Sequence, residues 1–165
     1  MRLNELHWFA TAAFGLEGIV AAELKRLGMR DVLAQNSGAA FVGSPGDAFR
    51  ACLWLRSADR VLLVLAQSEA RTFEELFQLV KSVPWEEFLP RNARIPVTGK
   101  CARSQLMSVR DCQAITKKAI VERLRHAWHV DWLSETGVSY PIDVALHGDL
   151  SLIHISEPTR RVVIS

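Results

Sequence analysis

The 165-residue chain lacks the features that mark several large classes of protein. It has only 9 Gly and 6 Pro and no repeated unit, which excludes collagen-like and low-complexity chains. No apolar run approaches the ~20 residues of a membrane span, and the N-terminus has no signal-peptide pattern. We therefore expect a cytoplasmic protein with no membrane partner. Hydrophobic residues make up 49% of the chain, which excludes intrinsic disorder.

Cysteine is scarce, and no cofactor motif is present. Three Cys, an odd number without zinc-site spacing, indicate reduced thiols. Cys101 and Cys112 flank a basic stretch. Thiols in an electropositive site can be reactive, but buried structural cysteines are the favoured interpretation. No phosphate-binding Gly-rich loop occurs, and His126 with His129 has no third metal ligand nearby in sequence. The sequence thus predicts no catalytic residue, no metal site and no cofactor site in this chain.

The net charge of +2 conceals an uneven distribution. Residues 1–90 carry 9 Lys/Arg and 11 Asp/Glu, whereas residues 91–126 carry 9 Lys/Arg and only 2 Asp/Glu. Residues 127–149 carry 4 acidic residues and no Lys or Arg. A block of +7 in a nearly neutral protein is typical of a surface that binds a polyanion, and a solvated helix face is the alternative.

The apolar periodicity predicts an α+β chain. In the first 70 residues it predicts a βαββαβ order, the ferredoxin-like split unit, with strands near 7–13, 32–35, 39–42 and 60–66 and helices from 16 and 45. In the second half, Thr72 and Glu75 form a capping-box pattern for a helix to about residue 82. A strand near 94–100, a long helix from Ser108 to about Trp128 and a strand near 138–146 follow.

The long predicted helix carries much of the basic block. Its four cations on one arc of about 100° are Arg110, Lys117, Lys118 and Arg125. Lys100, Arg103 and Ser104 lie in the strand and turn just before it. Hydroxyl groups among cations suit phosphate and sugar contacts, which supply most hydrogen bonds between proteins and nucleic acids. Most of the five Trp lie in apolar patterns, which favours core packing over base stacking, with Trp85 the least certain.

Several motifs in order along residues 5–149 resemble one family. They are FATAAFGLE at 9–17, LWLRSADRV at 53–61, PWEEFLP at 84–90, PVTGK at 96–100, SVRDCQ at 108–113, KKAIV at 117–121, and YPI with VAL at 140–146. Together they resemble the RlmL-type THUMP-domain methyltransferases, class I S-adenosylmethionine-dependent enzymes that modify guanine N2 of large-subunit ribosomal RNA.

The resemblance implies a ferredoxin-like domain at 1–70 and a THUMP RNA-binding domain at 71–149. It implies RNA as the partner, with large-subunit ribosomal RNA as the expected kind. In the family a methyltransferase domain follows in cis, so the full-length parent would be an enzyme using S-adenosylmethionine and this fragment alone would be inactive. The match assigns RNA contact to Lys100, Arg103, Ser104, Lys117 and Lys118, whereas Arg110 and Arg125 are assigned from helix geometry alone.

Residues 150–165 resemble the translation of a transposase sequencing adapter. We therefore expect the natural chain to stop near Asp149, leaving the last THUMP strand truncated. A natural strand is the alternative, because Leu152, Ile153 and Ile155 suit a strand.

Three other functions stay open from the sequence. The module could belong to a THUMP enzyme that modifies transfer RNA, a methylase or a thiouridine synthase. It could be a ferredoxin-like regulatory or dimerisation domain that binds no RNA, against which the basic block argues. It could also be a truncated, partly folded fragment whose exposed strand edges favour aggregation.

Overall fold

The computed structural model describes residues 5–102, 106, 108–147 and 150–156. It confirms the predicted α+β class and divides the chain into two compact units, one built on residues up to Val64 and the other spanning Leu65–Ile155. In this part of the chain, no helix has the length and apolarity needed to cross a membrane.

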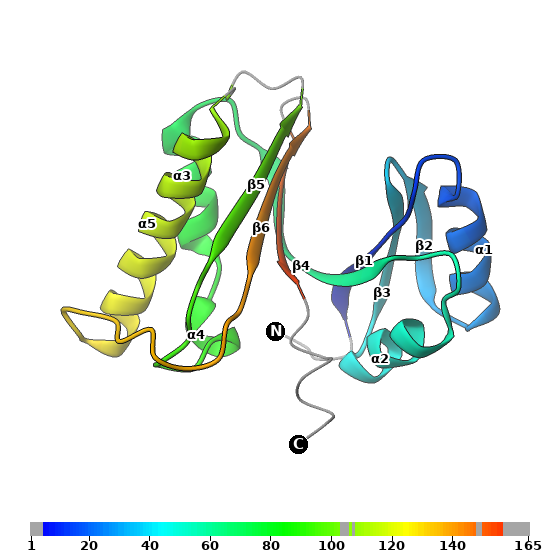
Figure 1. Cartoon of the computed structure of the whole chain (residues 1–165), viewed down its shortest axis with the longest axis horizontal. Helices are drawn as coiled ribbons and strands as arrows, with labels where there is room; N and C mark the ends of the chain where they lie inside the picture. The colour runs from blue at the N-terminus through cyan, green and yellow to red at the C-terminus, as the bar shows by residue number, and fades with distance from the viewer. Residues whose placement is uncertain (1–4, 103–105, 107, 148–149, 157–165) are drawn as a thin grey trace. The chain divides into compact units, whose positions relative to one another are not determined.

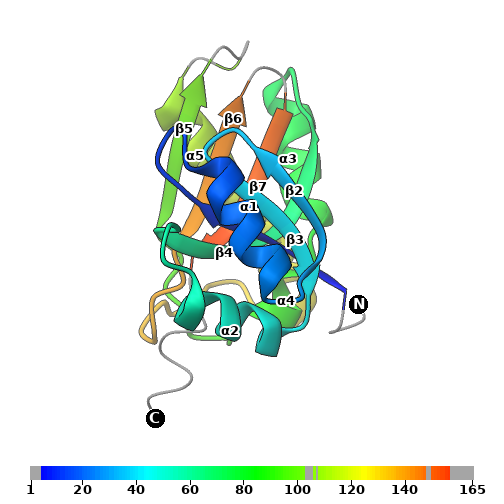
Figure 2. The same cartoon turned by 90° about the vertical axis from the view of Figure 1, so that its right-hand side faces the viewer.

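Unit 1 has the predicted βαββαβ order. Its elements are β1 (Leu6–Thr11), α1 (Glu17–Arg26), β2 (Arg30–Gln35), β3 (Gly38–Gly43), α2 (Pro45–Trp54) and the first part of β4 (Arg60–Glu69). Strand β1 pairs antiparallel with both β3 and β4, which gives the order β2-β3-β1-β4. Helix α1 lies over β2 and β3 and buries its apolar stripe of Val20, Ala21 and Leu24 (Figure 2).

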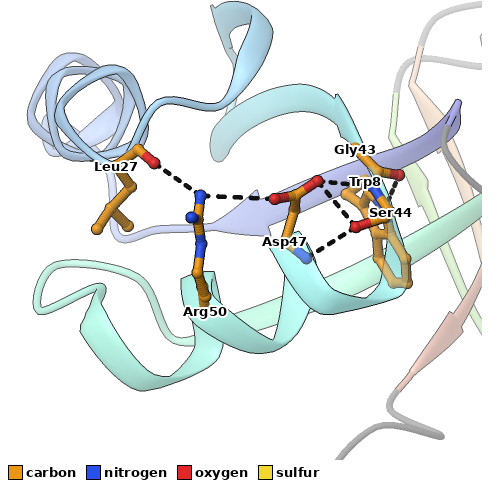
Figure 3. Close-up of polar contacts among 6 residues, drawn as sticks. All are labelled: Trp8, Leu27, Gly43, Ser44, Asp47 and Arg50. Atoms are coloured by element: carbon orange, nitrogen blue, oxygen red, sulfur yellow. Dashed lines mark hydrogen bonds and ion pairs between the residues drawn. The ribbon is translucent and has the colours of Figure 1, made fainter.

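A cluster of polar contacts stabilises the start of α2 (Figure 3). The Ser44 hydroxyl accepts from the Asp47 amide at 3.2 Å, and Asp47 accepts from the Ser44 amide at 2.9 Å, a reciprocal capping box. The hydrogen bonds that the Asp47 carboxylate accepts from the Ser44 amide and hydroxyl hold the pKa of Asp47 below its usual value. Trp8 donates to the Gly43 carbonyl at 3.0 Å, and Arg50 donates to the Leu27 carbonyl at 2.8 Å. These polar side chains therefore connect helices and strands within unit 1.

Unit 2 contains the second part of β4 and the elements α3 (Phe73–Ser82), α4 (Trp85–Phe88), β5 (Val97–Ala102), α5 (Val109–Trp128), β6 (Ile142–His147) and β7 (Leu150–Ser156). The strand order is β4-β7-β6-β5, with β5 parallel and β7 antiparallel to β6. Helices α3 and α5 pack side by side over this sheet (Figure 1). Their apolar faces and the inward strand positions form one core, in which Trp85, Ile120 and Ile142 are fully buried.

The helix starts of unit 2 follow the sequence signals. Thr72 and Glu75 form the predicted capping box of α3, and the Ser108 hydroxyl accepts from the Asp111 amide at the start of α5. The strand predicted from residue 94 begins only at Val97. Pro96 has no N–H to donate to a ladder, and Arg94 makes just an isolated bridge to Ser139.

The structure differs from the prediction of a missing last strand. Strand β7 is present and pairs with β6 from Ile142↔Ile155 to His147↔Leu150. Its inward positions include Ile153 and Ile155, which are buried in the core. Ladder hydrogen bonds come from the backbone and the burial from alternate side chains, and this segment, which lies between β4 and β6 in the strand order, has the required alternation. The pairing therefore fills the strand position whatever the origin of these residues.

Candidate nucleic-acid interface

The structure places the predicted RNA-binding residues on two elements of unit 2. Four lie on α5: Arg110, Lys117, Lys118 and Arg125. Lys100 lies on β5, and Arg103 and Ser104 fall outside the described residues. The five predicted residues that the structure describes differ in their surroundings, because some of their side chains already make contacts within the protein.

Three cations of α5 form an exposed row. Arg110, Lys118 and Arg125 are solvent-exposed, and their spacing confines them to about 80° of the helix circumference. Within the described part of the chain, no carboxylate lies within ion-pair distance of these three side chains. The exposed row, meaning these three residues from here on, therefore has no carboxylate counter-ion among the described residues.

One carboxylate lies beside the exposed row and is already bound. Glu122 accepts from Lys81 of α3 at 2.6 Å. This hydrogen bond, with smaller effects of Lys118 and Arg125, holds the pKa of Glu122 below its usual value. Because Lys81 compensates the charge of Glu122, the row keeps most of its positive potential.

Helix α3 adds an aromatic side chain to this surface. The ammonium groups of Lys81 and Lys118 lie 5.6 and 5.8 Å from the ring centroid of Phe77, within cation–π range. Phe77 and Lys81 are not predicted from the sequence as neighbours of the row. No signal in a single sequence shows that α3 packs beside α5, although the capping box correctly predicts α3 itself.

Lys117 differs from its neighbour Lys118. Its ammonium donates to Glu135 at 2.6 Å and to the Ile95 carbonyl at 2.8 Å. Burial pushes the pKa of Glu135 up, but its hydrogen bonds from Lys117 and from the Ile95 amide outweigh this and hold that pKa below the usual value. Lys117 thus ties α5 to the segment before β5, and RNA contact by Lys117 stays a prediction.

Arg123, part of the same basic block, is also engaged. Its guanidinium makes a two-pronged contact with Glu86 of α4, at 3.1 Å from Nε to Oε2 and 2.5 Å from NH2 to Oε1. This contact lowers the pKa of Glu86. Lys117 and Arg123 are called the paired cations below. The paired cations connect α5 to other segments of unit 2 instead of facing an external ligand.

Lys100 lies on the other face of the sheet from α5. A Cβ added to Gly99 would meet the Gln113 side chain at 3.3 Å, so Gly99 faces α5. Successive strand residues alternate between faces, and Lys100 therefore points away from α5, as does Thr98, whose hydroxyl bonds Asp143 at 2.7 Å. The structure does not bring Lys100 into the exposed row.

The tryptophans divide into two groups. Core packing is confirmed for Trp8 and Trp85, and Trp85 is fully buried with its indole N–H donating to the Val80 carbonyl at 2.7 Å. The same expectation is wrong for Trp54 and Trp132, which are 65% and 77% exposed. Each has an apolar residue next to it in sequence, Leu53 and Leu133, but Trp54 lies at the end of α2 and Trp132 in a connecting segment.

Two family models match the chain. The RlmL ferredoxin-like domain matches residues 7–62, and the THUMP domain matches residues 70–155. The chain belongs to the THUMP domain family. Its THUMP domain corresponds to unit 2, which carries the exposed row, and the match continues into β7.

Named relatives of this THUMP protein are methyltransferases. YpsC of Bacillus subtilis, named as a candidate RNA methyltransferase, is 43% identical over 146 residues, covering 87% of this chain and 38% of YpsC. Ribosomal RNA large subunit methyltransferase K/L of Syntrophotalea carbinolica is 38% identical over 120 residues, covering 73% of this chain and 17% of that enzyme.

A solved structure has the same fold. A protein of Listeria monocytogenes, described as a predicted N6-adenine-specific DNA methylase, superposes with a TM-score of 0.87 at 44% identity, covering 92% of this chain and 40% of that one. The chain therefore spans less than half the length of each of these three relatives. Their descriptions differ in the nucleic acid that they name.

Proposed function

We propose that this chain is the RNA-docking part of a ribosomal RNA guanine-N2 methyltransferase. The observation that carries the proposal is the exposed row of Arg110, Lys118 and Arg125 on α5 of a THUMP domain. Cations without carboxylate partners attract the phosphate backbone, and they position RNA by charge and shape more than by base identity. The docked guanine would be presented to a methyltransferase domain that follows in cis, with large-subunit ribosomal RNA as the substrate.

The methyl donor of such an enzyme is S-adenosylmethionine, and the two described strand-to-helix turns of unit 1 do not fit it. In both described strand-to-helix turns of unit 1, carboxylates of the chain itself bind backbone amides. Glu17 accepts from the Gly15 amide at 2.9 Å, and Asp47 accepts from the Ser44 amide. No Gly-rich cofactor loop follows any strand in the sequence. We therefore assign the chain substrate docking and no step of methyl transfer.

The match of the RlmL ferredoxin-like model to residues 7–62 favours this function over a transfer-RNA enzyme. The solved 4-thiouridine synthetase–RNA complex shares only 13% identity at a TM-score of 0.57, which shows the fold alone.

A titration with labelled ribosomal RNA fragments tests the proposal. The variant Arg110→Gln/Lys118→Gln/Arg125→Gln removes the exposed row. The matched control Lys25→Gln/Arg26→Gln/Arg56→Gln removes three exposed cations from unit 1. Three lost phosphate contacts weaken binding roughly 50-fold at about 0.15 M salt, if each contributes about 0.7 to the salt exponent. The control is expected to bind like the unchanged protein.

Two outcomes would contradict the proposal. Equal affinity of the row variant and the unchanged protein would remove the exposed row from RNA binding. Equal binding of RNA and of DNA with the same sequence would replace RNA docking by general nucleic-acid binding, in keeping with the description of the Listeria relative.

We also propose that residues 150–165 are adapter-derived and that the natural sequence stops near Asp149, inside the THUMP domain. The similarity of these residues to a translated adapter supports this origin. Sequencing the source DNA across codon 149 tests it, and a native coding sequence without adapter would contradict it.

A further inference from the structure

Two cysteines of unit 2 meet between β5 and the first turn of α5. Cys101 lies on β5 and Cys112 on α5, and their Sγ atoms are 3.9 Å apart. Val97, Gly99 and Cys101 occupy alternate strand positions and so face the helix. Gly99 allows the approach, because a Cβ there would meet the Gln113 side chain of α5 at 3.3 Å. The packing of the strand against the helix therefore brings the two sulfur atoms into contact.

We propose that Cys101 and Cys112 form a thiol–disulfide pair, with Cys101 the site at which a small disulfide such as glutathione disulfide first reacts. Both are free thiols in this structure. A disulfide bond requires a separation of about 2.05 Å between sulfurs, so a closing movement of roughly 2 Å is needed. Disulfides that form in reducing compartments are usually transient, and they are catalytic or redox-sensing.

The two thiols differ in access, and this difference sets the order of events. Cys112 is fully buried, whereas Cys101 is only partly buried. Burial, followed by the proximity of Cys101, raises the pKa of the Cys112 thiol to about 12. The thiolate is the attacking species in disulfide exchange, so Cys112 is slow to react and is out of reach of a bulky oxidant.

The proposed sequence has two exchange steps. The Cys101 thiolate attacks one sulfur of glutathione disulfide, which forms a mixed disulfide at Cys101 and releases one glutathione thiolate. Cys112 then gives its proton to solvent, and its thiolate attacks Cys101 Sγ and releases the second glutathione. In total, two protein thiols are oxidised by two electrons and one glutathione disulfide is reduced to two glutathione molecules.

A disulfide bond between Cys101 and Cys112 would connect the two ends of a segment that contains predicted RNA-binding residues. Residues 102–111 include Arg103 and Ser104, the contacts implied by family resemblance, and Arg110 of the exposed row. Oxidation therefore ties a redox signal to the docking surface, and this consequence rests on the proposed function. The chemistry of the cysteine pair does not depend on it.

Intact-mass analysis of the full chain after treatment with glutathione disulfide tests the pair. A Cys52→Ser background removes the exposed third cysteine, on α2. In this background we expect a product lighter by two hydrogens, and a peptide map that joins Cys101 to Cys112. Adding Cys112→Ser should trap a stable glutathione adduct on Cys101, whereas adding Cys101→Ser should leave the protein unmodified. Bond closure should accelerate about tenfold per pH unit near neutrality, following the Cys112 thiolate fraction.

Three results would contradict the proposal that Cys101 and Cys112 form a thiol–disulfide pair. These are no product lighter by two hydrogens, glutathione on Cys112 in the Cys101→Ser protein, or a product with glutathione on both cysteines. RNA titration of the oxidised and reduced protein then tests the consequence separately. We expect a several-fold difference in RNA affinity between the oxidised and the reduced protein, and no such difference in the Cys101→Ser variant. Equal affinities would remove the redox control while leaving the disulfide chemistry and the proposed RNA docking each to their own tests.

Discussion

Helix α5 carries two sets of cations that the sequence cannot distinguish but the structure separates. The exposed row has no carboxylate partners among the described residues, whereas each of the paired cations, Lys117 and Arg123, bonds a glutamate from another segment. The adjacent Lys117 and Lys118 show the difference most clearly. A formal charge block therefore contains two kinds of cation: some form ion pairs within unit 2, and the others are exposed without a carboxylate partner among the described residues.

Removing Arg123 gives the largest expected stability effect in this comparison. Arg123→Met breaks the two-pronged contact with Glu86, a partly buried pair whose side chains are 32% and 26% exposed. We expect a loss of about 1–2 kcal/mol in the free energy of unfolding by urea, with RNA affinity unchanged. A double-mutant cycle with Glu86→Gln isolates the pair. Additive effects of the two substitutions would contradict the contact.

The matched variants Lys117→Met and Lys118→Met test the comparison at neighbouring positions. Lys117→Met removes an ion pair and a hydrogen bond to a carbonyl, so we expect a stability loss of about 1 kcal/mol. Lys118→Met should change stability by less than about 0.5 kcal/mol but weaken RNA binding about fourfold at about 0.15 M salt. If both variants lost only RNA affinity, the distinction between the two sets would fail.

The buried face of α5 provides a third test. Thr116 is fully buried, and its hydroxyl has no hydrogen-bond partner within the described part of the chain. Thr116→Val replaces that hydroxyl by a methyl group of similar size. We expect a gain of up to about 1 kcal/mol, measured as a higher midpoint of thermal unfolding, and no change in RNA affinity. A clear loss of stability would show that the hydroxyl has a partner.

At acidic pH, the stability difference caused by Arg123→Met should disappear. The pKa of Glu86 is lower in the folded protein than its ordinary value of 4.5, so its stabilising contribution is complete above about pH 5 and is lost as the pH falls through the folded pKa. The stability difference between the unchanged protein and Arg123→Met should therefore shrink below pH 4.5. Urea titrations at several pH values measure it, and a difference that grows in acid would contradict the pairing.

Local signals predicted much of the fold. The Thr72–Glu75 capping box and the Ser108 cap fixed the starts of α3 and α5, because both are interactions between residues three positions apart. The order of elements in unit 1 also followed from apolar periodicity. The exposure of Trp54 and Trp132 was not predicted, and the strand β7 was only the alternative expectation, since burial and sheet completion depend on which distant segments cover a position.

The candidate site was predicted only in part. Arg110 and Arg125, assigned from helix geometry alone, lie in the exposed row with Lys118. Lys117 could not be separated from Lys118 by sequence, because its partners Glu135 and Ile95 lie 18 and 22 residues away and meet it only after folding. Charge count measures what a chain contains, and packing determines which charges remain available.

The salt dependence of RNA binding tests the central claim most directly. The slope of log affinity against log salt should become shallower by about 2 when Arg110, Lys118 and Arg125 are all changed to Gln, since each lost phosphate contact removes about 0.7. The slope should stay unchanged in Arg123→Met, where the cation is bound to Glu86. An unchanged slope in the exposed-row variant, or an equally reduced slope in Arg123→Met, would contradict the account.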